Sequence, residues 1–423
     1  MATSIDAAPS EEGTVSGFTL RNCALLDVEA GVLRPGHGVR VEDDRIVEVF
    51  EGDAPSGVES FDGGGRTLMP GLIDAHVHAT ITTLNLAAMQ TKPMTLVSQE
   101  ARVILEAMLQ RGFTTVRDAG GADWGLARAV ESGLIQGPRI FFSGRTLSQT
   151  GGHGDFRPRN DDTALCACQI HSTGFSHVAD GVDAVRKAAR EELKRGANQI
   201  KIMASGGVAS PTDPVWNVQY SPEEMRAIVQ EAEGWRTYAM AHAYTPEAVT
   251  RAVEAGVRTI EHGNLVDRET VALMADRGTY MVPTLVTYFM LDEFGRALGF
   301  PKASQAKVRD VLDAGLASLE LCRDAGVPLG FGTDLLGETH EHQSREFSIR
   351  AQVLRPAEIL RSATLVNAEI LGRQGDLGVI APGARADLLL VDGNPLEDLS
   401  VLEDQGKRLD AIVKDGAFVR NRL

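Results

Sequence analysis

Short apolar runs alternate with helical patterns over most of the chain, and this alternation constrains the fold more than any other feature. Eight such runs occur, at residues 68–78, 114–118, 139–143, 199–203, 238–242, 259–263, 280–285 and 328–334. Strands that alternate with helices over about three hundred residues are typical of a (β/α)8 barrel. We therefore predict an α/β protein built on a (β/α)8 TIM barrel.

The segments between the runs carry signals for helix starts and stops. Residues 221–224 predict a capping box with proline at the first helical position, and Thr245 opens the next helix in a similar way. A helix also needs a left-handed cap before the chain turns back into the sheet. Glycines stand shortly before five of the runs and fit this role: Gly112, Gly196, Gly256, Gly278 and Gly326.

Several runs end in residues that can bind a metal. His76 and His78 stand one residue apart, and alternate side chains of a strand share a face, so both imidazoles project to the same end of the barrel. Taken alone, the pair is as well explained by two hydrogen-bonded polar side chains. His242, His262 and Asp334 follow later runs, however, and the active site of this fold lies at the C-terminal ends of the strands.

Charge and composition exclude some classes of function. The net charge is −16 and no basic tract is present to neutralise phosphates, which argues against nucleic-acid binding. No stretch is long and apolar enough to cross a membrane. Residues 1–13 have neither the basic start nor the apolar segment of a signal peptide, so we read them as a disordered leader and expect a cytoplasmic protein.

The cysteines do not indicate a disulfide framework, because only four occur in a chain of this length. Cys166 and Cys168, with His171 and His177 nearby, form a possible zinc cluster. Their C-x-C spacing departs from the gap that is usual between paired zinc ligands. Packing or loop roles are the better interpretation.

Two flanks lie outside the predicted barrel. Residues 14–70 and 375–423 contain short strand-like pieces separated by glycine-rich turns. Neither flank alone has enough strands for a stable sandwich. We expect them to form one small β-sandwich domain together, with the barrel at residues 71–374 as the insertion.

These motifs resemble the amidohydrolase superfamily over nearly the whole chain. The resemblance rests on PGLIDAHVH at residues 70–78 and GARADL at residues 383–388, together with the runs between them. IKIMASGG at residues 200–207, GGHGD at 151–155 and AHAY at 241–244 are similar to the branch that contains Xaa-Pro dipeptidases and ochratoxin-degrading amidohydrolases. Within that branch, the chain as a whole resembles bacterial amidohydrolases that degrade ochratoxin A.

The resemblance implies a binuclear metal centre with two zinc ions per subunit. It assigns the ligands to His76, His78, Lys201, His242, His262 and Asp334. A lysine is normally a cation with a pKa of about 10.4 and would repel metals. The resemblance implies that Lys201 reacts with carbon dioxide to a carbamate, an anion that bridges both metals. The alternative is an ordinary surface lysine, but the flanking Ile200 and Ile202 favour an inward side chain.

Catalysis and substrate binding need further groups. Asp334 can take a proton from the attacking water and deliver it to the leaving nitrogen. The polar segment 144–181 is expected to be a loop that covers the substrate, and within it His153 is a candidate for contacting the substrate carbonyl or the oxyanion. Tyr244 and Arg117 are further candidate donors to the substrate, although a structural ion pair of Arg117 with Asp118 explains that position equally well.

The resemblance implies hydrolysis of an amide bond between an acyl or aminoacyl group and an amino acid with a free carboxylate. Dipeptides and ochratoxin A, which would give ochratoxin alpha and phenylalanine, fit this description. A homo-oligomer is also implied, with an octamer as one state. The alternatives are a cyclic-amide hydrolase or deaminase, similar to imidazolonepropionase, cytosine deaminase or dihydroorotase, and a non-enzymatic scaffold. Lys201 argues against the relatives with one metal, and the complete set of candidate ligands argues against the scaffold.

Overall fold

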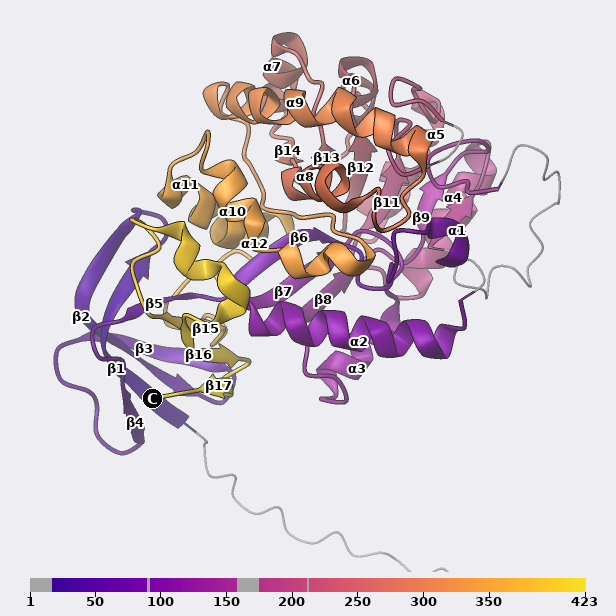
Figure 1. The fold of residues 1–423 in the computed structure, drawn as a ribbon. Coiled ribbons are helices and arrows are strands. Elements are labelled where there is room, and N and C mark those ends of the chain that lie inside the picture. Colours follow the sequence, from indigo (N-terminus) through magenta and orange to yellow (C-terminus); the bar gives the residue numbers. More distant parts are fainter. Residues whose placement is uncertain (1–16, 90–91, 158–174, 211–212) are drawn as a thin grey trace, which may run out of the picture.

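The structure of the protein is a computed structural model that describes residues 17–89, 92–157, 175–210 and 213–423. Figure 1 shows two parts side by side, a β-sheet part that contains the C-terminus and a larger part in which helices surround short strands. The leader expected at residues 1–13 lies outside the described residues. No helix of the described residues is long and apolar enough to cross a membrane.

The strands of the larger part pair in parallel, as expected for strands connected by helices. They form a three-stranded group in the order β6-β7-β8 and a six-stranded group in the order β10-β9-β11-β12-β13-β14. In chain order they are β6 (Leu72–Val77), β7 (Phe113–Asp118), β8 (Arg139–Phe142), β9 (Thr146–Ser148), β10 (Ser176–Val178), β11 (Ile200–Met203), β12 (Ala239–Ala243), β13 (Thr259–His262) and β14 (Tyr280–Val282).

The last predicted run, residues 328–334, is not a regular strand. Leu329 forms an isolated parallel bridge with Met281 of β14. On the other side, the amide of Ala75 in β6 donates to the carbonyl of Phe331 at 2.8 Å. The run therefore lies between β14 and β6, in the position of an eighth barrel strand. Glycines at 330 and 332 weaken it as a strand, because they have no side chain to pack.

The segment 144–181 also differs from the expected loop. It contributes β9 and β10, which pair in parallel with each other, and β9 also pairs with β11. Residues 158–174 of the segment, which include Cys166, Cys168 and His171, lie outside the described residues. His177 lies on β10, and its buried Nδ1 has no hydrogen-bond partner among the described residues.

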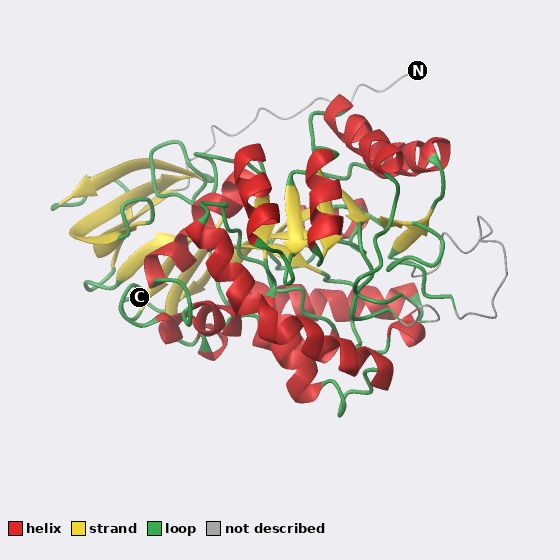
Figure 2. Cartoon of the chain, turned by 90° about the horizontal axis from the view of Figure 1, so that it is seen from above, coloured by secondary structure: helices red, strands yellow, loops and turns green. Residues whose placement is uncertain are grey.

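Helices cover the strands of the larger part, as seen from above in Figure 2. The capping box at Ser221 and the side-chain cap at Thr245 are confirmed. All five predicted capping glycines have positive φ, between 63° and 94°. The helices are α1 (Leu86–Met89), α2 (Met94–Gln110), α3 (Trp124–Glu131), α4 (Val182–Lys194), α5 (Pro222–Gly234), α6 (Pro246–Glu254), α7 (Arg268–Arg277), α8 (Leu285–Phe294), α9 (Lys302–Asp324), α10 (Arg345–Arg350), α11 (Pro356–Arg361) and α12 (Asn367–Ile370), with shorter turns at Gly337–His342, Ser362–Val366, Leu399–Leu402 and Asp404–Gly406.

The smaller part is one sheet built from both ends of the described chain. Its hydrogen-bonded path runs β17-β16-β15-β5-β1-β2-β3, and β4 pairs with β1. A separate apolar cluster that includes Leu20, Val39 and Leu388 forms its core. The strands are β1 (Gly17–Asp27), β2 (Val32–Glu42), β3 (Arg45–Glu51), β4 (Glu59–Asp62), β5 (Thr67–Pro70), β15 (Leu388–Val391), β16 (Leu409–Lys414) and β17 (Ala417–Asn421).

The two parts are joined at the start of β6, the strand that carries His76. β5 leads through Gly71 into β6, and a Cβ at Gly71 would lie 2.1 Å from the hydroxyl of Thr114, so only glycine fits this crossing. The Arg139 guanidinium, at the start of β8, donates to the carboxylate of Asp387 at 2.7 Å and to that of Asp415. These contacts fix the position of β8 relative to the terminal sheet, and the chain through Gly71 connects β6 to the same sheet.

Candidate metal centre

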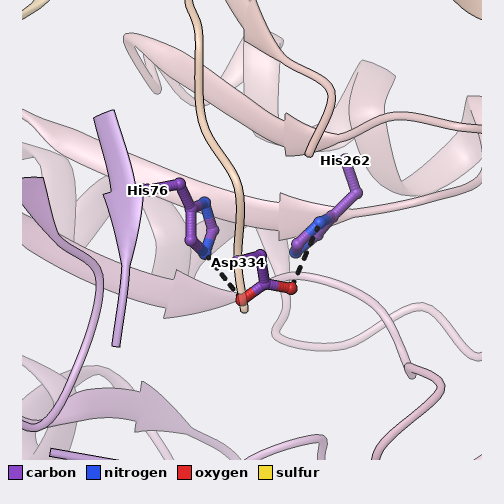
Figure 3. Close-up of side chains that lie close together, drawn as sticks. All are labelled: His76, His262 and Asp334. Carbon is purple, nitrogen blue, oxygen red and sulfur yellow. Dashed lines mark ion pairs between the residues drawn. The ribbon is translucent and has the colours of Figure 1, made fainter. Parts of the chain in front are cut away.

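The candidate ligands converge at the C-terminal ends of the strands of the larger part. β6 and the residue after it carry two histidines, β11 carries a lysine, β12 and β13 carry one histidine each, and the run 328–334 ends in an aspartate. These residues are His76, His78, Lys201, His242, His262 and Asp334. Figure 3 shows that His76 and His262 approach the carboxylate of Asp334 from opposite sides. The structure thus brings the whole predicted ligand set together.

Distances within this cluster suit a metal centre. The Nε2 atoms of His76 and His78 lie 3.4 and 3.2 Å from Oδ1 of Asp334. The amine of Lys201 lies 3.4 Å from Nε2 of His76. Ligand atoms of His76, His262 and Asp334 all lie within 4.8 Å of one another. These three residues could therefore hold a metal ion.

Each of the four imidazoles has one nitrogen engaged by an acceptor outside the cluster. Nδ1 of His76 contacts Glu261 at 2.6 Å, and Nδ1 of His78 contacts the Gly120 carbonyl at 2.8 Å. Nε2 of His242 lies 3.3 Å from a backbone carbonyl, and Nδ1 of His262 lies 2.8 Å from the hydroxyl of Thr284. The carboxylate and carbonyl partners can only accept, so they fix the tautomer of His76, His78 and His242, and all four contacts leave the other nitrogen free to bind a metal. The donor set therefore fits the implied metals.

Burial favours the neutral forms that metal binding needs. It lowers the pKa of both His242 and His262 well below the ordinary value, and the neighbouring imidazoles lower both further. Burial also lowers the pKa of the Lys201 amine to about 8, although the nearby carboxylates of Glu261 and Asp334 oppose this change. The neutral amine is the form that can react with carbon dioxide, so the site makes this form accessible.

The backbone positions Asp334 with unusual geometry. Its φ is 52°, in the left-handed region, and its amide donates to the carbonyl of His76 at 2.8 Å. The preceding Thr333 donates its hydroxyl to the buried carboxylate of Asp74 at 2.7 Å. Burial raises the pKa of Asp334, but hydrogen bonds and charge from the neighbouring histidines hold it well below the ordinary value. The side chain is thus held as a carboxylate.

Arg117 does not reach the substrate pocket, and this corrects our expectation. Its guanidinium is fully buried and forms two hydrogen bonds with the carboxylate of Glu261, at 2.8 and 3.0 Å. The expected pairing with Asp118 is also wrong. Asp118 instead accepts backbone amide hydrogen bonds from Ala79, Gly120 and Ala122. Arg117 thus holds the carboxylate that contacts His76, and Asp118 supports the backbone directly after His78.

A pocket opens next to the ligand cluster, and it contains the other two predicted contact residues, His153 and Tyr244. The ring of His153 stacks on that of His242 with centroids 4.2 Å apart. Its Nδ1 lies 2.8 Å from the hydroxyl of Ser210, which leaves Nε2 for a substrate. The glycine at 207 is required here, since a Cβ would lie 2.1 Å from the His153 ring.

The rest of the pocket wall is mainly apolar. Burial raises the pKa of the Tyr244 phenol, so it remains a hydrogen-bond donor at neutral pH. Among the described lining residues, Lys201 is the only lysine or arginine. The apolar lining residues are Ile81, Leu86, Phe156, Phe175, Met203, Ala209, Leu291 and Leu336. Such a wall favours an apolar group on one side of the scissile bond.

Sequence reasoning missed the groups that hold the ligands in place. Glu261 stands inside an apolar run, directly before His262. An acidic residue in such a run indicates a buried partner, because charged side chains are rarely buried unpaired. Asp74 gives the same signal two residues before His76. Thr284 and Tyr288 carry no local signal, because their roles depend on contacts with residues far away in the sequence.

The fold is of the α/β class and carries a candidate metal site at the ends of its strands, and comparison with known proteins identifies the family. The model of the Amidohydrolase family matches residues 67–418. The chain is 33% identical to the ochratoxinase of Aspergillus niger over 401 residues, which covers 89% of this chain and 83% of that protein. The chain therefore belongs to the amidohydrolase family.

Solved structures support the same branch. A prolidase complexed with N-methylphosphonate-L-proline is 54% identical, with a TM-score of 0.94, over 96% of this chain and 100% of the other. A Xaa-Pro dipeptidase with methionine bound in its active site is 31% identical, with a TM-score of 0.87, over the same shares. The protein is thus a hydrolase that acts on amide bonds.

Proposed function

We propose that the protein is a binuclear zinc amidohydrolase that cleaves the amide bond between an acyl or aminoacyl group and an amino acid with a free carboxylate. The observation that carries this proposal is the convergence of the six candidate ligands, with one nitrogen of every imidazole already engaged elsewhere. The similarity to a prolidase and to an ochratoxinase supports this substrate class.

The metals would be held by the four histidines, by Asp334 and by Lys201 as a carbamate. When bound, two zinc ions would supply a hydroxide nucleophile and polarise the scissile carbonyl. The buried amine of Lys201 lies 3.4 Å from Nε2 of His76, and its charge also acts on His242 and His262, which supports a bridging role. The carbamate would add the negative charge that neutral imidazoles cannot supply.

Asp334 would move the proton during hydrolysis. Its carboxylate contacts His76 and His78 and keeps 19% of its side-chain surface exposed, so it borders both the ligands and the pocket. An amide nitrogen leaves poorly until it is protonated. Asp334 would accept a proton from the attacking water and donate it to that nitrogen.

His153 and Tyr244 would bind the substrate. Nε2 of His153 is the nitrogen available to the carbonyl oxygen or to the developing oxyanion, since Ser210 engages Nδ1. The phenol of Tyr244 would donate to the free carboxylate. The apolar wall would accept a hydrophobic side chain, such as that of proline or phenylalanine.

The strands of the larger part support a closed barrel. We infer a (β/α)8 barrel at residues 71–374 in which the run 328–334 closes the gap between β14 and β6. Residues 14–70 and 375–423 would form the composite β domain, and the strand pairing of β5 with β15 supports it. We further propose a homo-oligomer, as the family resemblance implies.

A substrate panel tests the function. Protein stripped with a chelator and then loaded with zinc is incubated with N-acyl amino acids, dipeptides, hydantoins and ochratoxin A, while zinc is quantified by elemental analysis. We expect about two zinc ions per chain and turnover of the open-chain amides that carry a carboxylate. Turnover of hydantoins alone would instead support a cyclic-amide hydrolase. Retention of full activity without metal would contradict the proposal.

A further inference from the structure

The start of α8 brings two hydroxyl groups to the candidate site. Nδ1 of His262 lies 2.8 Å from the hydroxyl of Thr284, which directly precedes α8. Tyr288 follows in the first turn of the same helix. Its hydroxyl lies 2.8 Å from the hydroxyl of Tyr244, which lines the pocket.

The direction of the hydrogen bond between the two tyrosines follows from their surroundings. Tyr288 is buried and does not line the pocket, so its single hydroxyl proton needs a protein acceptor, and the Tyr244 oxygen lies within hydrogen-bond distance. With Tyr288 as the donor, the proton of Tyr244 is directed to the pocket.

Backbone geometry and burial hold the start of α8 and the two tyrosines in place, beginning with Thr284. Its φ is 42°, in the left-handed region, where a β-branched residue is strained. The residue is fully buried, as is nearly all of Tyr288. The ring of Tyr244 is fixed independently, because it stacks on His262 with centroids 5.3 Å apart and meets His242 edge-on at 4.9 Å. The position of the phenol is therefore set by packing, and the orientation of its proton by Tyr288.

We propose that Tyr288 is a positioning residue that orients the Tyr244 hydroxyl as a donor to the substrate carboxylate. This inference rests on the proposed function, since it needs Tyr244 to contact that carboxylate. Tyr288 itself does not line the pocket. It would act on binding only through Tyr244.

The test uses Tyr288→Phe, Tyr244→Phe and the double variant, all zinc-loaded. The probe is a free amino acid product, L-proline or L-phenylalanine, whose Kd is measured by calorimetry beside that of its carboxamide. Tyr288→Phe should weaken binding of the free acid by about 3- to 10-fold and change binding of the carboxamide much less. In the Tyr244→Phe background, Tyr288→Phe should have no further effect. Zinc content should stay unchanged in all three variants.

Tyr280→Phe is the matched control, since its hydroxyl contacts Glu369 outside the pocket, and it should bind both probes normally. Independent, additive effects of the two tyrosine variants would overturn the positioning role. An unchanged Kd for the free acid in Tyr288→Phe, beside a weakened one in Tyr244→Phe, would also overturn it. If Tyr244→Phe changes neither Kd while the panel shows hydrolysis, the carboxylate contact fails and the amidohydrolase function stands.

Discussion

The carboxylate of Glu261 lies 2.6 Å from Nδ1 of His76, and both side chains are fully buried. Glu261 is the residue directly before the candidate ligand His262, so one strand serves two imidazoles through adjacent positions. Arg117 neutralises the carboxylate from the other side at 2.8 Å. Burial raises the pKa of Glu261, but Arg117 and His76 lower it far more, so the group stays ionised. It can therefore hold His76 in the tautomer that presents Nε2 to a metal.

Glu261→Gln tests this role. The amide keeps the shape of the side chain but removes the negative charge, so zinc affinity should fall by about 10- to 100-fold. A competition titration of the metal-free protein against a chromophoric chelator measures this change. Glu131→Gln, at an exposed position, is the control. Equal zinc affinity in both variants would show that Glu261 serves only the buried ion pair.

Lys201→Ala should abolish most activity and weaken zinc binding, because position 201 would no longer provide a bridging anion. Addition of a short carboxylic acid with bicarbonate should restore part of the activity by filling the space left by the side chain. Zinc content and turnover are measured with and without the acid. Full turnover in Lys201→Ala, with both metals bound, would rule out the carbamate.

Asp334→Asn separates metal binding from proton transfer. Asparagine keeps the shape of the side chain and an oxygen ligand but cannot carry the proton, so kcat should fall by at least about 100-fold. Much of the zinc should remain bound, because the four histidines and Lys201 are intact. Elemental analysis and kcat are compared on the same preparation. A kcat close to that of the parent protein would assign the proton transfer to another group.

Esterification of the substrate tests recognition of the carboxylate. One hydrogen bond from Tyr244 to a charged carboxylate contributes roughly 1.5 to 3 kcal/mol, so the methyl ester should have a kcat/KM at least about tenfold lower. The same ester should be affected much less in Tyr244→Phe, which has already lost the donor. If the parent protein hydrolyses the ester and the acid at equal rates, Tyr244 does not recognise the carboxylate, and the result favours a cyclic amide as the substrate.

Arg139→Met should destabilise the protein through the junction of its two parts. The Arg139 side chain is 15% exposed and that of Asp387 only 5%. The free energy of unfolding should therefore fall by roughly 1 to 3 kcal/mol, between the values for exposed and buried ion pairs. Burial raises the pKa of Asp415, but Arg139 lowers it below the ordinary value. This stabilisation is therefore complete above about pH 4 and is lost as the pH falls further. Urea midpoints of both proteins should differ at pH 7 and approach each other at pH 3.

Local patterns were sufficient to predict the parts of the fold that depend on neighbours in the sequence. The capping box at Ser221 and the left-handed glycines lie where expected, because each depends on a few adjacent residues. The candidate ligands converge because parallel strands place the residues at their C-terminal ends on the same rim of a barrel. β9 was not predicted, since the run at Thr146–Ser148 is short and polar and pairs with residues far away in the sequence.

Long-range pairing also explains the error at Arg117. An arginine beside an aspartate suggests a local ion pair, but in a strand the two side chains point to opposite faces. Arg117 instead finds Glu261, which is 144 residues further along the chain. No local pattern distinguishes such a partner from a substrate carboxylate. The contacts of Tyr288 were missed for the same reason. The sequence of α8 indicates only an apolar helix.

The junction between β5 and β6 has a consequence for the order in which the protein can mature. β5 pairs with β15, whose residues are Leu388–Val391, and continues through Gly71 into the strand that carries His76. A ribosome makes this partner strand only after all six candidate ligands, the last of which is Asp334. The first two histidines are thus the earliest candidate ligands synthesised, yet the strand before them lacks one of its neighbours until β15 has been made. Metal loading should therefore follow synthesis of β15, and a nascent chain stalled before residue 388 should capture zinc poorly.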